Sequence, residues 1–284
     1  MLKSLTFISA TGAEMPLLQS DYFNIVDVDG FTRIQSDISS VIIPYVDGDK
    51  ITKIQAQPRP VTLYLRLKQS AGIEKAKRYI FQFVKPKVQG IIRAEQDGRT
   101  LELIGTVEEI DLPRFERGCI MAISLHCSTP YWQDVKQVIS GLSQIINLHY
   151  FPLDQGGLAF PVEGVPFGAY DDDLSQEIVN LGDASTGLVI KIVAKGEVVN
   201  PKIYNTFTGE YVGINDTLQT NDEVTISTVK GEKYILKNGV NIIDKIMSGA
   251  TFLQLATGVN EFTISADSGI EAVYFTMMYR QLYV

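Results

Sequence analysis

The sequence contains little histidine and little cysteine, two residue types that catalysis and metal binding often use. Its 284 residues include two histidines, two cysteines and one tryptophan. Neither His126 nor His149 has a partner at the spacing of HxxxH or HExxH, the usual metal-binding patterns. The chain also lacks a GxSxG nucleophile turn, a P-loop and a GxGxxG turn that opens a helix. We therefore expect that the protein is not an enzyme and that it has no catalytic, cofactor-binding or metal-ligating residues.

Cysteine pairs and long apolar runs are also missing, which excludes further classes of protein. Cys119 and Cys127 lie eight positions apart in one apolar run, which fits neither a CxxC pair nor a disulfide framework. We expect two buried thiols, and no catalytic Cys–His pair, because adjacent strand residues point to opposite faces. No segment reaches the roughly 20 consecutive apolar residues of a membrane helix. Ser4, Thr6 and Ser9 interrupt the N-terminal apolar stretch, so no signal peptide is expected.

Positive charge is in the minority, since 25 Lys and Arg residues face 33 Asp and Glu residues, for a formal net charge of −8. This balance has the wrong sign for wrapping DNA or lying on an anionic membrane, because phosphate binding needs clustered cations. A local basic patch remains compatible with it. The acidic run Asp171–Asp173 has consecutive carboxylates, whereas calcium loops alternate their ligands, so a solvated linker is the better interpretation.

Alternating apolar residues predict a mainly β fold. Leu63–Leu67 and Ile190–Val193 place apolar side chains at every second position, as half-buried strands do. The clearest hairpin is expected over Gln89–Ile110, with Asp97-Gly98 at its tip. Because 45% of the residues are hydrophobic, the chain can bury a sizeable core, and its length suggests about two domains. Turn signals recur at strand-like intervals, at Asp29-Gly30, Asp47-Gly48, Asp97-Gly98, Thr208-Gly209, Lys230-Gly231, Asn238-Gly239 and Ser268-Gly269.

One helix is expected in the first half of the chain. It is predicted by an apolar stripe at helical spacing, formed by Ile73, Ala76, Ile80 and Phe83. Pro86 is expected to end it. The segment 135–146 also has helical spacing, but Gly141 and the β-branched residues favour a strand, a turn and a second strand nearly as well. Both alternatives stay open for that segment.

A change of composition marks the best domain boundary. Between Phe151 and Asp173, glycine, proline and aspartate replace the regular pattern. We therefore expect an N-terminal domain over residues 1–133, a connecting segment over 134–173 and a C-terminal β-sandwich over 174–284.

Several motifs, taken in order, resemble a known family. The pattern C-x-x-P-Y-W, at Cys127 to Trp132, resembles the segment that closes the first domain of distal tail proteins of long-tailed phages. Other markers of that domain are Gln57–Leu63, the helix at Glu74–Val84, Lys85-Pro86 and the hairpin end Gly105–Glu108. Markers that resemble the second domain follow in the expected order: Phe160–Val162, Val179–Gly187, Val199–Asn205, Thr208–Tyr211, Asn221-Asp222 and Phe252–Asn260.

The resemblance covers nearly the whole chain and implies a structural protein of the virion, assembled in the bacterial cytoplasm. Such proteins form a hexameric ring at the tail tip, between the tail tube protein and the tail-associated lysin or receptor-binding apparatus. The resemblance implies that the first domain forms the ring and that the second is a galectin-like sandwich. The motif residues are expected to be architectural, since they suit turns and packing. They are Cys127, Pro130, Tyr131, Trp132, Asn180, Gly182, Asp183, Asn200, Pro201, Gly258 and Asn260.

A ring requires apolar strand surfaces that face the neighbouring copy. Ser40–Val46 and Ile51–Leu67 are the candidate segments. The expected ring-interface residues within them are Val41, Ile42, Ile43, Tyr45, Leu63 and Leu65. Six copies would carry a formal charge of −48, which is expected to repel DNA phosphates, so that the genome passes the lumen without specific binding.

The alternative function is a carbohydrate-binding module, in which the C-terminal sandwich contacts host cell-wall glycans. Its candidate stacking residues are Trp132, Tyr204, Phe207 and Tyr211. After Glu177 the chain has one arginine, Arg280, and no tryptophan, which favours core aromatics over a sugar platform. A glycosidase has the least support, because no pair of carboxylates stands out.

Overall fold

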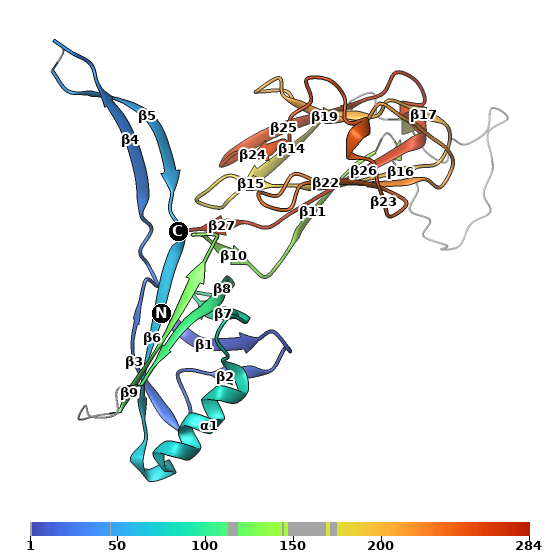
Figure 1. Cartoon of the computed structure of the whole chain (residues 1–284). Helices are drawn as coiled ribbons and strands as arrows, with labels where there is room; N and C mark the ends of the chain where they lie inside the picture. Colours follow the sequence, from blue (N-terminus) through green and yellow to red (C-terminus); the bar gives the residue numbers. More distant parts are fainter. Residues whose placement is uncertain (1, 46, 113–118, 144, 147–168, 171–174) are drawn as a thin grey trace, which may run out of the picture. The chain divides into compact units, whose positions relative to one another are not determined.

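The chain folds into two compact β units, one of which is inserted into the other (Figure 1). The computed structural model describes residues 2–45, 47–112, 119–143, 145–146, 169–170 and 175–284. Unit 1 comprises Met1–Lys136 and Leu282–Val284, and unit 2 comprises Gln137–Gln281. The chain therefore leaves unit 1 through one strand and returns to it through another.

Strand pairing places the bounds of the units at other residues than the composition suggests. β11 (Val138–Ser143), expected in the connecting segment, pairs with β26 (Val273–Tyr279) of unit 2. β27 (Leu282–Tyr283), expected in the sandwich, pairs with β10 (Trp132–Asp134) of unit 1. Both pairings join strands that are distant in the sequence, so local composition does not reveal them. Asp171–Asp173 and most of the expected connecting segment lie outside the described residues.

Unit 1 is a nine-stranded antiparallel sheet with a helix packed on it. The strand order is β2-β1-β7-β8-β9-β6-β3, and β10 pairs with both β8 and β27. The 3-10 turn η1 (Gln69–Ala71) leads into α1 (Ile73–Phe83), which contacts β1, β2 and β6. The strands before β10 in this sheet are β1 (Leu2–Ser9), β2 (Glu14–Pro16), β3 (Phe23–Asp29), β6 (Arg59–Leu67), β7 (Gln89–Gln96), β8 (Arg99–Asp111) and β9 (Ile120–Cys127).

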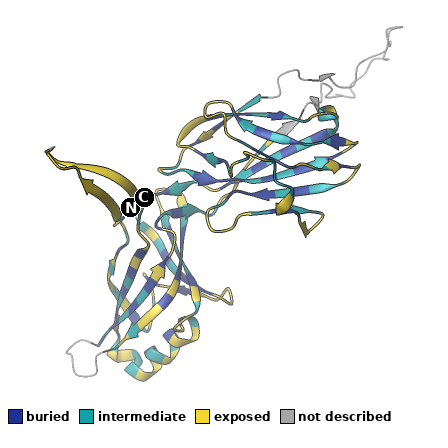
Figure 2. Ribbon diagram, turned by 45° about the horizontal axis from the view of Figure 1, so that its top comes forward, coloured by how far each residue is buried: buried dark blue, intermediate teal, exposed yellow. Residues whose placement is uncertain are grey.

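The core of unit 1 collects the inward residues of the sheet and of α1, dark blue in Figure 2. Strand β6 contributes every second residue, namely Val61, Leu63, Leu65 and Leu67. From α1, Ala76 and Ile80 are fully buried, and Ile73 and Phe83 pack against the same core. The predicted helix is confirmed, because it covers Ile73–Phe83 and ends before Pro86, which cannot continue a helix.

The predicted hairpin is confirmed as β7 and β8. Gln96 lies opposite Arg99, and the two residues between them have positive φ, 51° at Asp97 and 80° at Gly98. This is the conformation of a two-residue type I′ turn, whose twist matches that of the strands. The glycines of all seven expected turns have positive φ.

Unit 2 is a sandwich of two antiparallel sheets. Their strand orders are β11-β26-β16-β21-β22-β23 and β14-β25-β18-β19, and short ladders pair β12 with β13, β15 with β24 and β17 with β20. The remaining elements are β12 (Ile145–Ile146), β13 (Ala169–Tyr170), β14 (Ser175–Asn180), β15 (Thr186–Gly187), β16 (Val189–Ala194), β17 (Val198–Val199), β18 (Lys202–Asn205), β19 (Tyr211–Gly213), β20 (Thr217–Leu218), β21 (Glu223–Ser227), β22 (Tyr234–Lys237), β23 (Val240–Asn241), η2 (Ile243–Lys245), β24 (Gln254–Leu255), β25 (Gly258–Ser265) and η3 (Ile270–Ala272).

The core of unit 2 lies between its two sheets. Ile190 and Ile192 of β16 are fully buried and alternate with partly exposed residues, as predicted. Phe262 of β25 is buried against the same core. The segment 135–146, left open between helix and strands, forms β11 and β12. The mainly β class with a C-terminal galectin-like sandwich is therefore as expected. None of the described helices is long and apolar enough to cross a membrane.

Candidate functional site

A two-stranded hairpin projects from the sheet of unit 1 without a core beneath it (Figures 1 and 2). Its strands, β4 (Ser36–Ile42) and β5 (Asp49–Ala56), pair with each other and with no other strand in the described part of the chain. Each described residue from Ser36 to Gln55 is exposed. We call this hairpin, residues 36–56, the arm.

The strand register places four isoleucines on one face of the arm. Ile38 lies opposite Ile54, and Ser40 lies opposite Ile51, and residues directly opposite each other share a face. Ile42 lies on the same face, because it follows Ile38 and Ser40 at alternate positions. Ile38, Ile42, Ile51 and Ile54 are 57, 78, 52 and 65% exposed. Such a contiguous apolar face, which has no partner among the described residues, favours burial against another molecule.

A β-bulge brings these isoleucines together. Ile51 and Ile54 are three positions apart, so in a regular strand they would point to opposite faces. The register shifts between Ser39 and Ser40, which leaves Thr52 without a cross-strand partner. The Thr52 hydroxyl donates a hydrogen bond to the Ser39 carbonyl at 3.0 Å. The opposite face is mainly polar and carries Asp37, Ser39, Val41, Lys50, Lys53 and Gln55.

The expectation of a ring interface is wrong for two of the six residues. Leu63 and Leu65 of β6 are fully buried in the chain's own core, because they lie on the inward face of that strand. A neighbouring copy has no access to them in the folded chain. The register places Ile42 on the apolar face of the arm and Val41 on its polar face. The four remaining expected residues are exposed: Val41, Ile42, Ile43 and Tyr45.

Phe31 fixes the root of the arm. Its backbone carbonyl accepts hydrogen bonds from Nη1 of Arg59 and Nε1 of Trp132, both at 3.2 Å. Its ring packs on the indole of Trp132 with 4.9 Å between the ring centroids. Gly30 precedes it with a φ of 79°, and a Cβ at that position would lie 2.0 Å from the Pro60 carbonyl oxygen. Trp132, a motif residue, thus packs where β10 meets the root of the arm.

Arg59 is a buried cation at this root. It is 1% exposed, and its Nε and Nη2 have no hydrogen-bond partner among the described residues. Burial lowers the pKa of its guanidinium, because a low-dielectric environment disfavours the charged form. Cys127 lies opposite Arg59 in β9, and burial raises the pKa of its thiol to about 11. A thiol with this pKa is an inert core group.

The other expected cysteine and histidine features also have positions in unit 1. Both cysteines are free thiols, as expected, but Cys119 is half-buried rather than buried. His126 is exposed whereas Cys127 is buried, so the two adjacent side chains point to opposite faces, as expected. His149 lies outside the described residues. Pro130 is buried and Tyr131 is half-buried.

In unit 2, Asn260 holds the turn that precedes β25. Its Oδ1 accepts a hydrogen bond from the Ala256 N–H at 3.0 Å, and its Nδ2 donates to the carbonyls of Ala256 and Gly258 at 2.8 and 3.1 Å. The residue is 2% exposed. An amide side chain is needed here, because it supplies a donor and an acceptor to a turn that cannot satisfy its own backbone groups.

Asn180 does the same on the neighbouring strand. It lies opposite Gly258 in the register of β14 and β25. Its Nδ2 donates to the carbonyls of Ala184 and Leu255 at 3.0 and 3.3 Å, and its Oδ1 accepts from the Gly182 N–H at 2.9 Å. Motif residues from two distant segments therefore meet at one end of this strand pair. They are Asn180 and Gly182 from one segment, and Gly258 and Asn260 from the other.

The three other motif residues of unit 2 lie at turns. Asn200 has a φ of 55°, a left-handed conformation that asparagine tolerates, and its Nδ2 donates to Asp267 at 2.7 Å. Pro201 follows it and is buried, whereas Asp183 is exposed.

The candidate sugar-stacking residues do not form one open platform. Trp132 is 4% exposed in the core of unit 1. Tyr204 and Tyr211 are half-buried and pack on each other with 5.3 Å between ring centroids. The Tyr211 hydroxyl donates to the Ser248 carbonyl at 2.6 Å, and Phe207 is exposed. This arrangement does not favour the carbohydrate-binding alternative.

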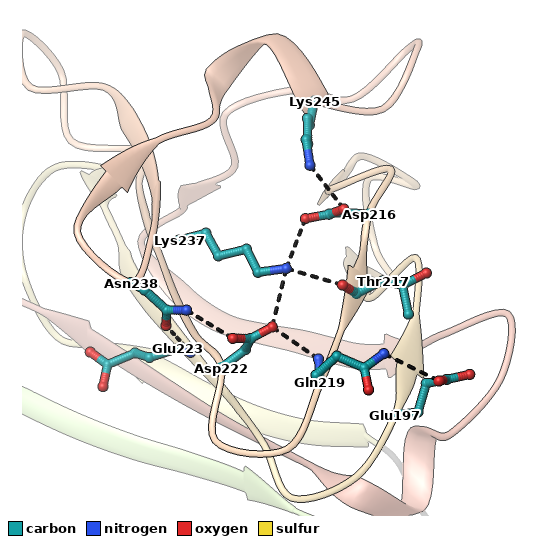
Figure 3. A network of polar contacts seen from close by, with 9 residues as sticks. All are labelled: Glu197, Asp216, Thr217, Gln219, Asp222, Glu223, Lys237, Asn238 and Lys245. Atoms are coloured by element: carbon teal, nitrogen blue, oxygen red, sulfur yellow. Dashed lines mark hydrogen bonds and ion pairs between the residues drawn. The ribbon is translucent and has the colours of Figure 1, made fainter.

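A network of charged side chains crosses one edge of unit 2 (Figure 3). The ammonium group of Lys237 lies 3.1 Å from Asp216 Oδ2 and 3.1 Å from Asp222 Oδ2, and it donates to the Thr217 carbonyl at 3.0 Å. Lys245 binds the other oxygen of Asp216 at 2.9 Å. The two carboxylates are thus neutralised by lysines. The described residues contain no group of three or more His, Cys, Asp or Glu that could hold a metal ion.

Asp222 is held ionised by this network. The Gln219 N–H and the Asn238 side chain donate to it at 2.9 and 2.8 Å, and together with Lys237 they lower the pKa of the carboxyl to about 2. Because the folded pKa lies below the unfolded value of about 3.9, the stabilisation is complete above about pH 5 and is lost as the pH falls toward 2.

We expect the free energy of unfolding to fall less on acidification in Asp222→Asn than in the wild-type protein. Because Asp222 is partly exposed, the difference between pH 5 and pH 2 is expected to shrink by about 1–2 kcal/mol. Urea unfolding at both pH values measures it. The exposed Asp244→Asn serves as the control and should keep the wild-type pH dependence. Equal pH dependence in Asp222→Asn and the wild type would contradict the assignment.

The described residues thus present an apolar arm in unit 1 and turn-forming motif residues in unit 2. The protein is therefore mainly β, with two antiparallel β units, one of which carries an exposed apolar hairpin.

Comparisons with known proteins give a family match for the C-terminal part of the chain and a fold match for the whole chain. Residues 181–283 match the family model described as the C-terminal domain of the siphovirus-type tail component. The whole chain has the fold of the SPP1 Dit protein, with a TM-score of 0.68 and 14% identity over 99% of this chain and 100% of that one. The resemblance to distal tail proteins is therefore confirmed: the chain has a siphovirus-type tail-component domain and the fold of a distal tail protein.

A second solved structure has a lower similarity. It is the baseplate of phage P2 in its activated conformation with calcium, with a TM-score of 0.50 and 9% identity over 98% of each chain. A comparison with the curated proteins gave no match. The SPP1 structure is described as a paradigm of the hub adsorption apparatus in phages that infect Gram-positive bacteria.

Proposed function

We propose that the chain is the structural hub of a phage tail tip or baseplate. Six copies close into a ring that joins the tail tube protein on one side to the tail-associated lysin or receptor-binding apparatus on the other. The lumen of the ring is the channel for DNA. In this function the protein acts through its interfaces, and its place is the virion.

The apolar face of the arm carries this proposal. Ile38, Ile42, Ile51 and Ile54 are each more than half exposed, which would be an aggregation hazard in a protein that stays monomeric. An arm that projects beyond its own unit suits a contact in which the arm of one copy packs on a different surface of the next. Such a head-to-tail contact generates a ring when its rotation closes. The fold shared with the SPP1 Dit hub protein supports the same proposal.

The charge of the chain suits a conduit for DNA. With a formal charge of −8 per copy, the ring repels phosphates and has no general affinity for the genome. Tight binding of duplex DNA by the wild-type protein at physiological salt would contradict this part of the proposal.

The solution mass and symmetry of the purified chain test the ring. Light scattering is expected to give the mass of six copies of a 31.5 kDa chain, or of two stacked rings. Class averages of negatively stained particles should show six-fold symmetry. A mass of one copy at all concentrations would contradict a ring that closes through the arm alone.

A further inference from the structure

Basic side chains gather around α1 in a chain that is acidic as a whole. Residues 66–87 contain seven of the 25 Lys and Arg residues but one of the 33 acidic residues, Glu74. This is the local basic patch that the composition left open. It lies at the end of β6 that leads into α1, whereas the arm continues from the other end of β6 (Figure 1). The nine residues of β6 separate the two ends by roughly 30 Å.

Five of these basic residues are exposed and have no ion-pair partner among the described residues: Arg66 at the end of β6, and Lys75, Arg78, Lys85 and Lys87 on or after α1. Lys75 and Arg78 lie on the side of α1 opposite the buried Ala76 and Ile80. Lys85 and Lys87 follow the end of the helix and are also exposed. We call Lys75, Arg78, Lys85 and Lys87 the basic face.

Two neighbouring lysines are already engaged within unit 1. Lys68 donates to the Ser20 carbonyl at 2.6 Å, and the ammonium group of Lys77 lies 6.0 Å from the centroid of the Phe81 ring. Phe81 itself is 36% exposed beside the basic face.

The charge of Lys75 does not serve the stability of α1. Lys75 lies in the first turn, where the positive end of the helix dipole repels a cation, and the last turn contains no basic residue. Lys75 and Arg78 are three positions apart and repel each other on the helix surface. Residues that oppose the local preferences of their element without a gain inside the fold are expected where function requires them.

We propose that the basic face is a docking surface for an acidic protein surface. The proposal rests on the proposed function, because a hub has to bind proteins other than its own copies. Exposed, unpaired cations beside an exposed phenylalanine suit a partner that offers carboxylates around an apolar contact. A protein partner is favoured over DNA, because the net charge of −8 repels a long polyanion whereas a compact acidic surface meets only the local patch.

Binding of two labelled probes to the full-length chain tests this proposal. The probes are a poly-glutamate peptide and a DNA duplex with the same number of charges, measured by fluorescence anisotropy at about 50 and 200 mM salt. The wild-type chain should bind the peptide more tightly than the duplex. Lys75→Glu combined with Arg78→Glu should weaken peptide binding at least about tenfold, since it replaces two attractions by repulsions.

A matched variant in unit 2 controls for net charge. Lys195→Glu combined with Lys230→Glu changes the charge of the chain by the same amount at two exposed lysines, and its peptide affinity should stay within about threefold of the wild type. Equal losses in both double variants, no peptide binding at the lower salt concentration, or tighter binding of the duplex would each overturn the proposal.

The solution mass separates this proposal from the ring. The Lys75→Glu, Arg78→Glu variant should keep the wild-type mass, and a change of mass would place the basic face in the self-association interface instead. A wild-type monomer that binds the peptide through the basic face would count against the ring and leave the docking surface standing.

Discussion

Lysine at both Ile42 and Ile54 is expected to convert the self-associated protein into a monomer. Burying an isoleucine side chain contributes about 1.5–3 kcal/mol, and the apolar face of the arm presents four of them. Two unpaired ammonium groups in that contact would remove much of this contribution and add the cost of desolvating the charges. The dissociation constant is expected to rise at least about 100-fold, as measured by light scattering over a concentration series.

The polar face of the arm provides the control. Ser39→Lys combined with Val41→Lys adds the same two charges to the same hairpin, but on the opposite face. This variant should keep the wild-type mass. Both variants should unfold at the wild-type urea concentration when they are compared as monomers, because the arm packs on no core of its own. Equal dissociation by the two variants would show that the register does not define the interface.

Alanine at Asn260 is expected to destabilise unit 2 by about 2–4 kcal/mol. The substitution removes three side-chain hydrogen bonds and leaves the Ala256 N–H and two carbonyls of a buried turn without partners. Loss of a buried amide that pairs several backbone groups costs more than an average hydrogen bond, because the remaining groups stay desolvated. Urea unfolding followed by circular dichroism measures the change.

Asn215→Ala is the matched control for Asn260→Ala. Asn215 is exposed at a turn of the same unit, so its substitution should change stability by less than about 0.5 kcal/mol. Equal midpoints for the two variants would contradict an architectural role of the Asn260 amide.

The elements with a strong local signal could be predicted from the sequence. The stripe at Ile73, Ala76, Ile80 and Phe83 predicted α1, and Asp97-Gly98 predicted the tip of a hairpin, because helical periodicity and positive φ are local properties. The return of β27 to unit 1 could not be predicted, because a strand of two residues acquires its meaning from a distant partner.

The arm shows why the candidate surface could be predicted only in part. Ile42 was expected there, but the contribution of Ile38, Ile51 and Ile54 depends on the bulge at Thr52, which a period of two residues hides. The isoleucine content of residues 38–54 was the available signal. The expectation of Leu63 at the ring interface is wrong for a related reason. Alternation shows that a strand has an apolar face, but not whether that face meets the chain's own core or a neighbouring copy.

The insertion of unit 2 between β10 and β27 makes it an exchangeable module. Trp132 lies opposite Tyr283 in this strand pair, and paired strands are about 5 Å apart, so the chain enters and leaves unit 2 at neighbouring points. Domains whose ends lie close together can be inserted into a host domain without disturbing it. Evolution or an engineer can therefore enlarge, shrink or replace unit 2 while unit 1 keeps the same strands, the same arm and the same basic face.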